Sequence, residues 1–247
     1  NDKSGLALNG FSDDNGYFIR TPWSSSFTDE LSPSAKTVEF RIKPNRLDGE
    51  NQHLFTISGS NSAKDPHLIL TNYSGADISS SNDSDRYGRI ELFINGSSVA
   101  QTQHFEVFNN KFCNVFIGVS GSHNTAADIK FGAHQANYLK RVFEYTSSFE
   151  QSAADRQLTF GDPTLGDNNI GGGTTVFIGG ISANENSSYD NIDSLRYSGS
   201  IQEVKYHFGE LLSHFTLKKH ALEPFMYSGN TPSSSYDNVV LRLPLGS

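Results

Sequence analysis

Aspartate and asparagine side chains gather in the polar turns of this 247-residue chain, where their oxygens could bind calcium. Ca²⁺ takes roughly six to eight hard oxygen ligands, which irregular Asp- and Asn-rich turns can supply. The candidate metal ligands are Asp162, Asp167, Asn168, Asp190 and Asp193, with Asn191 beside them and a further cluster at Asp13, Asp14 and Asn15. Because these residue types also favour turns for backbone reasons alone, a turn without a metal is the alternative interpretation.

Aromatic rings beside polar loops suggest a second chemistry, the stacking of sugar rings. Trp23 lies among turn-forming residues, and Tyr73 and Tyr189 flank segments rich in Ser and Asn. Together with the planar amide of Asn186, these three rings are the candidate ligand-binding residues. Asn186 and Tyr189 share a loop of a dozen residues, and loops of that length often carry function. The alternative for Trp23 is a partly buried ring that covers an edge of the fold.

Three further tyrosines, Tyr87, Tyr138 and Tyr197, also lie in or beside polar loops.

Residue patterns for catalysis are absent from the sequence. It has no Gly-x-Ser-x-Gly elbow, no His-Glu-x-x-His zinc helix and no phosphate-binding loop. The nearest pairs of carboxylates, Asp48 with Glu50 and Asp83 with Asp85, fall in Gly-, Ser- and Asn-rich turns. Such pairs are typical of solvated turns, so the sequence predicts that the chain is not an enzyme.

Three of the eight histidines, His207, His214 and His220, cluster near the C-terminus. Their spacings of seven and six residues differ from the i, i+4 pair of a metal-binding helix, so we expect them to pack or to face solvent. Cys113 is the one cysteine, which excludes an internal disulfide. It alternates with Val115 and Ile117 in an apolar segment, which predicts a buried, inert thiol.

The charge of the chain argues against nucleic acid as a partner. With 19 Lys and Arg against 27 Asp and Glu, the formal net charge is −8, whereas phosphate recognition needs a basic surface. No run of 18 apolar residues occurs, so we predict no membrane span. The start at Asn1, without Met, and the abrupt end at Ser247 indicate a piece of a longer polypeptide.

Alternating apolar and polar residues predict the strands that must position these side chains. In residues 37–44, Val38, Phe40 and Ile42 alternate with charged residues, as in a half-buried antiparallel strand. Further strands are expected at 53–57, 67–71, 89–94, 98–108, 112–119, 127–133 and 138–146. Asn95-Gly96 predicts a hairpin turn after the strand at 89–94. The predicted core residues are Phe40, Ile42, Leu92, Ile117, Ile178, Val204 and Tyr206.

The segment from Tyr197 to Pro224 predicts a turn, a strand with Val204, Tyr206 and Phe208 on one face, and a short helix. The helix is expected within residues 210–220, with an apolar patch of Leu211, Leu212, Phe215 and Leu217. An apolar strand ending in Gly179-Gly180 precedes this segment. The order resembles the closing pattern of laminin G-like and concanavalin A-like lectin domains, and it covers nearly the whole chain in order of elements.

This resemblance implies an all-β fold, an antiparallel jelly-roll β-sandwich with one short helix near the C-terminus. It implies binding rather than catalysis, with calcium held at a rim of the sandwich in many such domains. The glucanases of the same superfamily carry Glu-x-Asp-x-Glu on a strand, and that triple is absent here.

The domain is expected to span residues 1–226, with residues 227–247 forming a linker and either an edge strand or the start of a following domain. The segment from Ser234 to Gly246 resembles the tails of phage and other virion structural proteins. We therefore expect a noncatalytic binding or adhesion module of an extracellular or virion-surface protein, which contacts a glycan, a cell-surface protein or other virion subunits through its rim loops. A structural spacer or oligomerisation domain is one alternative, and a polysaccharide hydrolase or lyase is the other.

Overall fold

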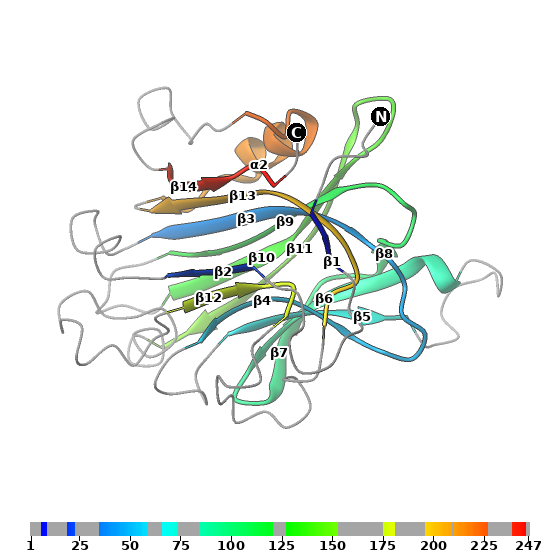
Figure 1. Ribbon diagram of the computed structural model, residues 1–247. Helices are drawn as coiled ribbons and strands as arrows, with labels where there is room; N and C mark the ends of the chain where they lie inside the picture. The colour runs from blue at the N-terminus through cyan, green and yellow to red at the C-terminus, as the bar shows by residue number, and fades with distance from the viewer. Residues whose placement is uncertain are drawn as a thin grey trace.

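Two antiparallel β-sheets face each other in the computed structural model, which describes residues 6–8, 19–22, 35–58, 66–73, 84–120, 127–152, 175–180, 196–208, 210–226 and 239–245 (Figure 1). All pairings between the strands of these sheets are antiparallel. The predicted all-β, antiparallel jelly-roll sandwich is therefore confirmed.

The first sheet, sheet A, contains seven strands. Their order is β1 (Leu6–Leu8), β13 (Gly199–Phe208), β3 (Lys36–Pro44), β9 (Cys113–Val119), β10 (Ala127–Ala136) and β11 (Val142–Gln151). The seventh, β14 (Val239–Leu243), pairs with β13 beyond the residues that pair with β1. Leu241, Leu243 and Leu245 pack against the core from this position.

The second sheet, sheet B, also contains seven strands. Their order is β2 (Ile19–Pro22), β12 (Thr175–Ile178), β4 (Gln52–Ser58), β5 (His67–Asn72), β6 (Tyr87–Ile94) and β7 (Ser97–Gln101). The short strand β8 (Phe105–Glu106) pairs with the start of β6, which follows the 3₁₀ turn η3 (Ser84–Arg86). Asn95 and Gly96 join β6 to β7 with positive φ angles of 54° and 68°, which confirms the predicted hairpin turn.

The core lies between the sheets and consists of the inward-facing residue of each alternating pair. In β3, Val38 and Phe40 lie opposite Ile117 and Val115 of β9, and the Phe40 ring stacks on Phe55 of sheet B with 6.3 Å between centroids. All the predicted core residues are buried in one cluster: Phe40, Ile42, Leu92, Ile117, Ile178, Val204 and Tyr206. Cys113 is also buried, and burial raises the pKa of its thiol to about 12, as expected of an inert cysteine.

One helix, α2 (His214–Leu222), lies on the outer face of sheet A against β9, β10 and β11. The Ser213 side chain caps it by accepting a hydrogen bond from the Thr216 backbone N–H at 3.2 Å. Leu217 packs with Leu212 and Phe116 beneath the helix. No helix in the described residues is long and apolar enough to span a membrane.

The prediction that Phe215 joins this apolar patch is wrong. Its side chain is 67% exposed, with the Lys219 ammonium 4.5 Å from the ring centre. Phe215 precedes Leu217 by two residues, which is about 200° around a helix of 3.6 residues per turn, so the two side chains point in opposite directions.

Candidate functional site

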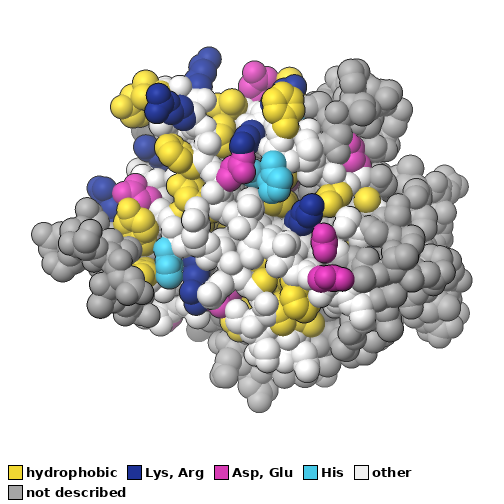
Figure 2. Space-filling model, turned by 180° about the vertical axis from the view of Figure 1, so that it is seen from behind, with side chains coloured by type: hydrophobic (Ala, Val, Ile, Leu, Met, Phe, Trp, Pro, Cys, Tyr) yellow, Lys and Arg dark blue, Asp and Glu magenta, His cyan; other side chains and the backbone are white. Residues whose placement is uncertain are grey.

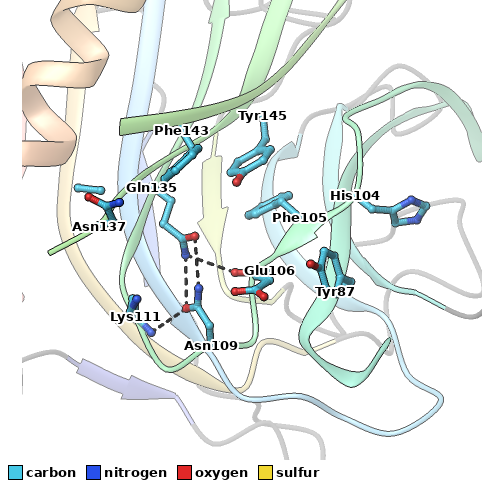
Figure 3. Close-up of a pocket in the computed structure, with 11 residues that line it drawn as sticks. Tyr87, His104, Phe105, Glu106, Asn109, Lys111, Gln135, Asn137, Phe143 and Tyr145 are labelled. Carbon is cyan, nitrogen blue, oxygen red and sulfur yellow. Dashed lines mark hydrogen bonds between the residues drawn. The ribbon is translucent and has the colours of Figure 1, made fainter. Parts of the chain in front are cut away.

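A groove opens at the edge of the sandwich between β10 and β11 of sheet A and β6 and β8 of sheet B, which all contribute lining residues (Figure 3). It encloses about 270 Å³, close to the lower end of the range for small-molecule sites, about 300–1,000 Å³. We call it the aromatic groove. Its described lining residues are Tyr87, His104, Phe105, Glu106, Asn109, Lys111, Gln135, Ala136, Asn137, Phe143 and Tyr145.

The register of β10 and β11 explains the aromatic wall. Phe143 lies opposite Gln135, and Tyr145 lies opposite Ala133, so both rings are on the face of sheet A that forms the core. At this end of the sheets the core face reaches solvent. Phe143 is 47% exposed, and Tyr145 stacks on Phe105 of β8 with 4.3 Å between ring centroids. The aromatic wall is therefore an exposed continuation of the hydrophobic core.

Gly132 permits the close approach of the strands beside Tyr145. Its φ angle is +145°, and a Cβ atom there would lie 2.2 Å from the Tyr145 carbonyl oxygen. A larger residue would force β11 away from β10 and would move the Tyr145 ring.

Side-chain amides form the polar end of the groove (Figure 3). Asn109 Nδ2 donates to Gln135 Oε1 at 3.3 Å, and Gln135 Nε2 donates to Asn109 Oδ1 and to the Glu106 carbonyl oxygen, both at 3.4 Å. Asn109 Oδ1 also accepts from the Lys111 backbone N–H at 3.0 Å. These bonds hold the two amides in fixed orientations beside the rings.

The charge of the groove is modest. Burial, followed by the nearby Glu106, raises the pKa of the Tyr145 hydroxyl, which keeps it protonated as a hydrogen-bond donor. Glu106 is the one carboxylate, and Lys111 the one lysine, among the described lining residues. Hydrolysis of a glycosidic bond generally needs two carboxyl groups about 5–9.5 Å apart, and the described lining of the groove supplies one.

A second hollow of about 420 Å³ adjoins the aromatic groove and shares Lys111, Ala136 and Asn137 with it. Tyr138, in the turn between β10 and β11, borders this hollow and is 86% exposed. The strand predicted at 138–146 begins instead at Val142. Asn137 accounts for the difference, because its Oδ1 accepts from the backbone N–H groups of residues 139 and 141, at 3.0 Å each, and closes a turn.

Most of the predicted site residues lie outside the described residues. These are Trp23, Asn186 and Tyr189 of the ligand-binding set, all five predicted metal ligands, Asp162, Asp167, Asn168, Asp190 and Asp193, and the other acidic turn at Asp13, Asp14 and Asn15. The sugar and calcium sites built on them remain predictions.

Tyr73 is the one described member of the predicted ligand-binding set, and it is 6% exposed. Its ring packs edge-on against His104, at 4.8 Å between centroids, and His104 lines the aromatic groove. Tyr73 thus supports a wall of the groove and presents no open face for stacking. Tyr197 is fully buried, and its hydroxyl donates to the Ser200 carbonyl oxygen at 3.1 Å.

Phe105, Phe143 and Tyr145 were missed in the sequence because they fall in strands, where an aromatic residue usually indicates core. Two tyrosines in polar surroundings were the available signal, since Tyr87 lines the aromatic groove and Tyr138 lines the second hollow.

A buried ionic cluster lies beneath α2 on the outer face of sheet A. Glu39 Oε1 lies 2.7 Å from His220 Nδ1, 3.2 Å from His207 Nε2 and 3.7 Å from Lys205 Nζ. Asn114 Nδ2 donates to Glu39 Oε2 at 2.9 Å. Although burial opposes ionisation, His220, His207 and Lys205 together hold the pKa of Glu39 well below its usual range. The carboxylate is therefore ionised and compensated by neighbouring side chains.

A second group on this face contains His134 of β10, Glu144 of β11 and His214 of α2. One potential ligand atom from each lies within 4.8 Å of the others. Burial, followed by His214 and Lys218, lowers the pKa of His134 to about 4, so its imidazole is neutral at pH 7. These three residues and the set of Glu39, His207 and His220 are the described groups whose ligand atoms could hold a metal ion.

The spacing of the histidines in the sequence did not predict either of these two groups. His207 and His220 stack at 5.9 Å between ring centroids, although one belongs to β13 and the other to α2. Their packing role is as expected, but the contact between His207 and Glu39 spans 168 residues and leaves no mark in the local sequence.

No protein-family model and no curated protein sequence matches this chain. Among solved structures, it is similar to a heptameric SAP-like pentraxin from Limulus polyphemus, with 16% identity, a TM-score of 0.49 and coverage of 87% of this chain and 80% of that one. It is also similar to the IT-sialidase CBM40 of Ruminococcus gnavus bound to alpha2,3 sialyllactose, with 13% identity, a TM-score of 0.42 and coverage of 88% and 92%.

A third similar structure is the full-length tailspike protein 2 from the Escherichia coli O157:H7 bacteriophage CAB120, with 13% identity and a TM-score of 0.47. The match covers 98% of this chain but 31% of the tailspike. These likenesses bring no function with them, because the identities are below 20% and the TM-scores are below 0.5. The fold class rests on the sheet topology of the chain itself.

Proposed function

We propose that this chain is a noncatalytic binding module that holds a glycan in the aromatic groove. The observation that carries the proposal is the arrangement of Phe143 and Tyr145 beside the fixed amides of Asn109 and Gln135. A sugar presents an apolar face of C–H groups and a rim of hydroxyls, which rings and planar amides complement. Small-molecule sites typically combine apolar and aromatic walls with a few placed polar groups, and both kinds of group line this groove.

The position of the groove supports this function. Its rings are extensions of the core, and its amides are held by hydrogen bonds to one another and to the backbone of residues 106 and 111. Binding would therefore order few side chains, and the entropic cost of association would be small. The adjoining hollow at Tyr138 could receive a second sugar unit, since the two hollows share Lys111 and Asn137.

The test is a glycan array followed by titration of the best ligand with Phe143→Ala. By analogy with base stacking, loss of this ring should weaken binding by about 1–3 kcal/mol. Because Phe143 is 47% exposed, its removal should leave the urea midpoint nearly unchanged. Phe215→Ala is the matched control, since it removes an exposed phenylalanine that lies outside the described lining of both hollows. Equal binding by wild type and Phe143→Ala would refute the proposal.

A lack of catalysis is part of the proposal, and a panel of polysaccharides tests it. We expect no new reducing ends after incubation with the protein. Release of such ends, abolished by Glu106→Gln, would instead assign the groove to a hydrolase or lyase.

Self-association is the second candidate function, because exposed apolar side chains gather beside the second hollow. Tyr138 and Leu222 border that hollow, and Phe225, shortly after α2, is 59% exposed. On the face seen in Figure 2, hydrophobic side chains of the described residues lie in separate groups among charges of both signs. Sedimentation of wild type and Phe225→Ser would separate the two functions, since a monomer that binds glycan excludes an oligomerisation role.

We further propose that the module belongs to a larger extracellular or virion structural protein. Its partners would be glycans or cell-surface proteins together with neighbouring structural subunits, and calcium at the acidic turns remains part of this proposal. Residues 227–247 would link it to the next part of that protein, with β14 as the segment anchored on sheet A.

A further inference from the structure

The outer face of sheet A carries an arrangement that glycan binding does not use. His134 is fully buried on β10, yet neither ring nitrogen has a hydrogen-bond partner among the described residues. Buried polar atoms are nearly always paired, and an unpaired one calls for a missing partner such as water or an ion. Both nitrogens of the His134 imidazole lack such a partner among the described residues.

Two further potential ligands converge on His134. Glu144 lies directly opposite it in the β10–β11 register, and His214 begins α2, which packs over both strands. The His134 and His214 ring centroids are 5.9 Å apart, and one ligand atom from each of the three residues lies within 4.8 Å of the others. Three separate elements thus contribute one donor each.

We propose that His134, His214 and Glu144 bind a zinc ion. Two imidazole nitrogens and one carboxylate oxygen are the donor set of many zinc sites with an open fourth position, whereas Ca²⁺ and Mg²⁺ prefer sites made of oxygens. Zn–N and Zn–O bonds are about 2.0–2.2 Å long. The three ligand atoms, which now lie within 4.8 Å of one another, must therefore move closer together to bind one ion. His214 and Glu144 can move to do so, because both side chains reach solvent while His134 is fixed in the sheet.

Lys218 is the competitor for this site. Its ammonium forms an ion pair with Glu144 Oε1, and both side chains are partly exposed, at 42% and 31%. Lys130 adds a second positive charge close to His214. Zinc must displace or share the Lys218 ion pair, which predicts that removal of Lys218 strengthens metal binding.

The neighbouring set of Glu39, His207 and His220 is a poorer zinc site. All three side chains are completely buried, and the Lys205 ammonium already lies 3.7 Å from the carboxylate oxygen. The Lys205 ammonium already supplies the positive charge that a metal ion would bring to this set. The proposal is therefore confined to the group with His134.

The experiment is isothermal titration of the tag-free chain with zinc chloride, after removal of metals by chelator. We expect one zinc ion per chain in wild type, an affinity at least about tenfold lower in His214→Ala, and a higher affinity in Lys218→Met. His214 is an exposed residue at the start of α2, so its replacement should leave the fold intact. His104→Asn is the matched control, because it removes an exposed histidine that lines the aromatic groove and belongs to neither described group of potential metal ligands.

Two readouts make the result decisive. Zinc that ties α2 to β10 and β11 should raise the melting temperature of wild type but not of His214→Ala, and calcium should have no such effect through this site. The proposal is refuted if wild type binds no zinc, if His214→Ala binds as tightly as wild type, or if His104→Asn causes the same loss. Weaker binding by Lys218→Met would also overturn the assignment, since the lysine would then not compete.

Discussion

Replacing Glu39 with glutamine is expected to lower the free energy of unfolding by several kcal/mol. The carboxylate is completely buried and lies within 4 Å of nitrogens of Lys205, His207 and His220. Removing one partner of a buried ion pair usually costs about 3–5 kcal/mol, because the remaining charge stays buried without compensation. The amide of glutamine matches the carboxylate in size, so the loss would be electrostatic and not a cavity effect.

The contacts of Lys205 place the expected loss at the lower end of that range, about 3 kcal/mol. Its ammonium also donates to the carbonyl oxygens of Pro224, at 2.9 Å, and Met226, at 2.5 Å, which remain in the variant. Burial already lowers the pKa of Lys205, and Glu39 opposes that effect. Without Glu39 the lysine could release its proton, which limits the penalty.

Urea unfolding at pH 7, followed by circular dichroism, measures this loss. Glu150→Gln is the matched control, because Glu150 is an exposed glutamate on β11 and should change stability by less than about 0.5 kcal/mol. The double variant Glu39→Gln with Lys205→Met should recover part of the loss, since it removes both members of the pair. A loss below about 1 kcal/mol for Glu39→Gln, or one equal to that of the control, would refute the electrostatic reasoning.

The remaining predictions concern the core, acid stability and the two predicted sites. Ile117→Ala should cost about 2–5 kcal/mol by denaturant titration, and a loss below about 0.5 kcal/mol would contradict its place in the core. Burial lowers the pKa of His53 well below its usual range and that of His67 to about 3, so both are neutral when folded. Because the unfolded chain binds these protons near pH 6.5, this stability is complete above that pH and is lost as the pH falls below it. For His67 the loss continues toward pH 3, at about 1.4 kcal/mol per pH unit. The change in unfolding free energy between pH 7 and pH 5 should be larger in wild type than in His67→Gln, which reports the contribution of all other groups. Equal changes in the two proteins would contradict this assignment. Millimolar calcium should raise the melting temperature if the acidic turns bind it. Identical melting curves in calcium and in chelator would show that these turns bind no calcium. Trp23→Ala or Tyr189→Ala should weaken glycan binding by about 1–3 kcal/mol at unchanged stability if the rim loops bind the sugar; unchanged binding with a large loss of stability would favour a structural role.

Strand faces could be predicted from the sequence because period-two alternation separates the core face of a strand from its other face. It did not show that Glu39 and Arg41, on the other face of β3, are buried as well, so the expectation of a half-buried strand is wrong. Val38, Phe40 and Ile42 alternate with charged residues, and they are buried as expected. The Asn95-Gly96 turn was equally visible, since few other dipeptides adopt two successive positive φ angles. Helix position was less well defined. The face of α2 that packs depends on where Phe116 lies beneath it, and the local sequence cannot show that.

The candidate site was less predictable than the fold. The groove lies where the core face of sheet A reaches solvent, so Phe143 and Tyr145 look like core residues in the sequence although they border solvent. The grouping of His134 with His214 depends on a helix that crosses two strands, at a separation of 80 residues. Residue types identified the possible chemistry, but only the tertiary arrangement brings the partners together.

The place of β13 in sheet A, between β1 and β3, has a consequence for how the chain folds during synthesis. β3 is complete at Pro44, yet one of its two neighbours, β13, begins at Gly199. A ribosome must therefore add more than 150 residues before this edge of β3 can be covered. Such distant pairings slow folding, and until they form, an uncovered strand edge can pair with another chain. Nascent chains that stop before β13 should thus aggregate, and chaperones that bind exposed strands should act on this protein mainly in that interval.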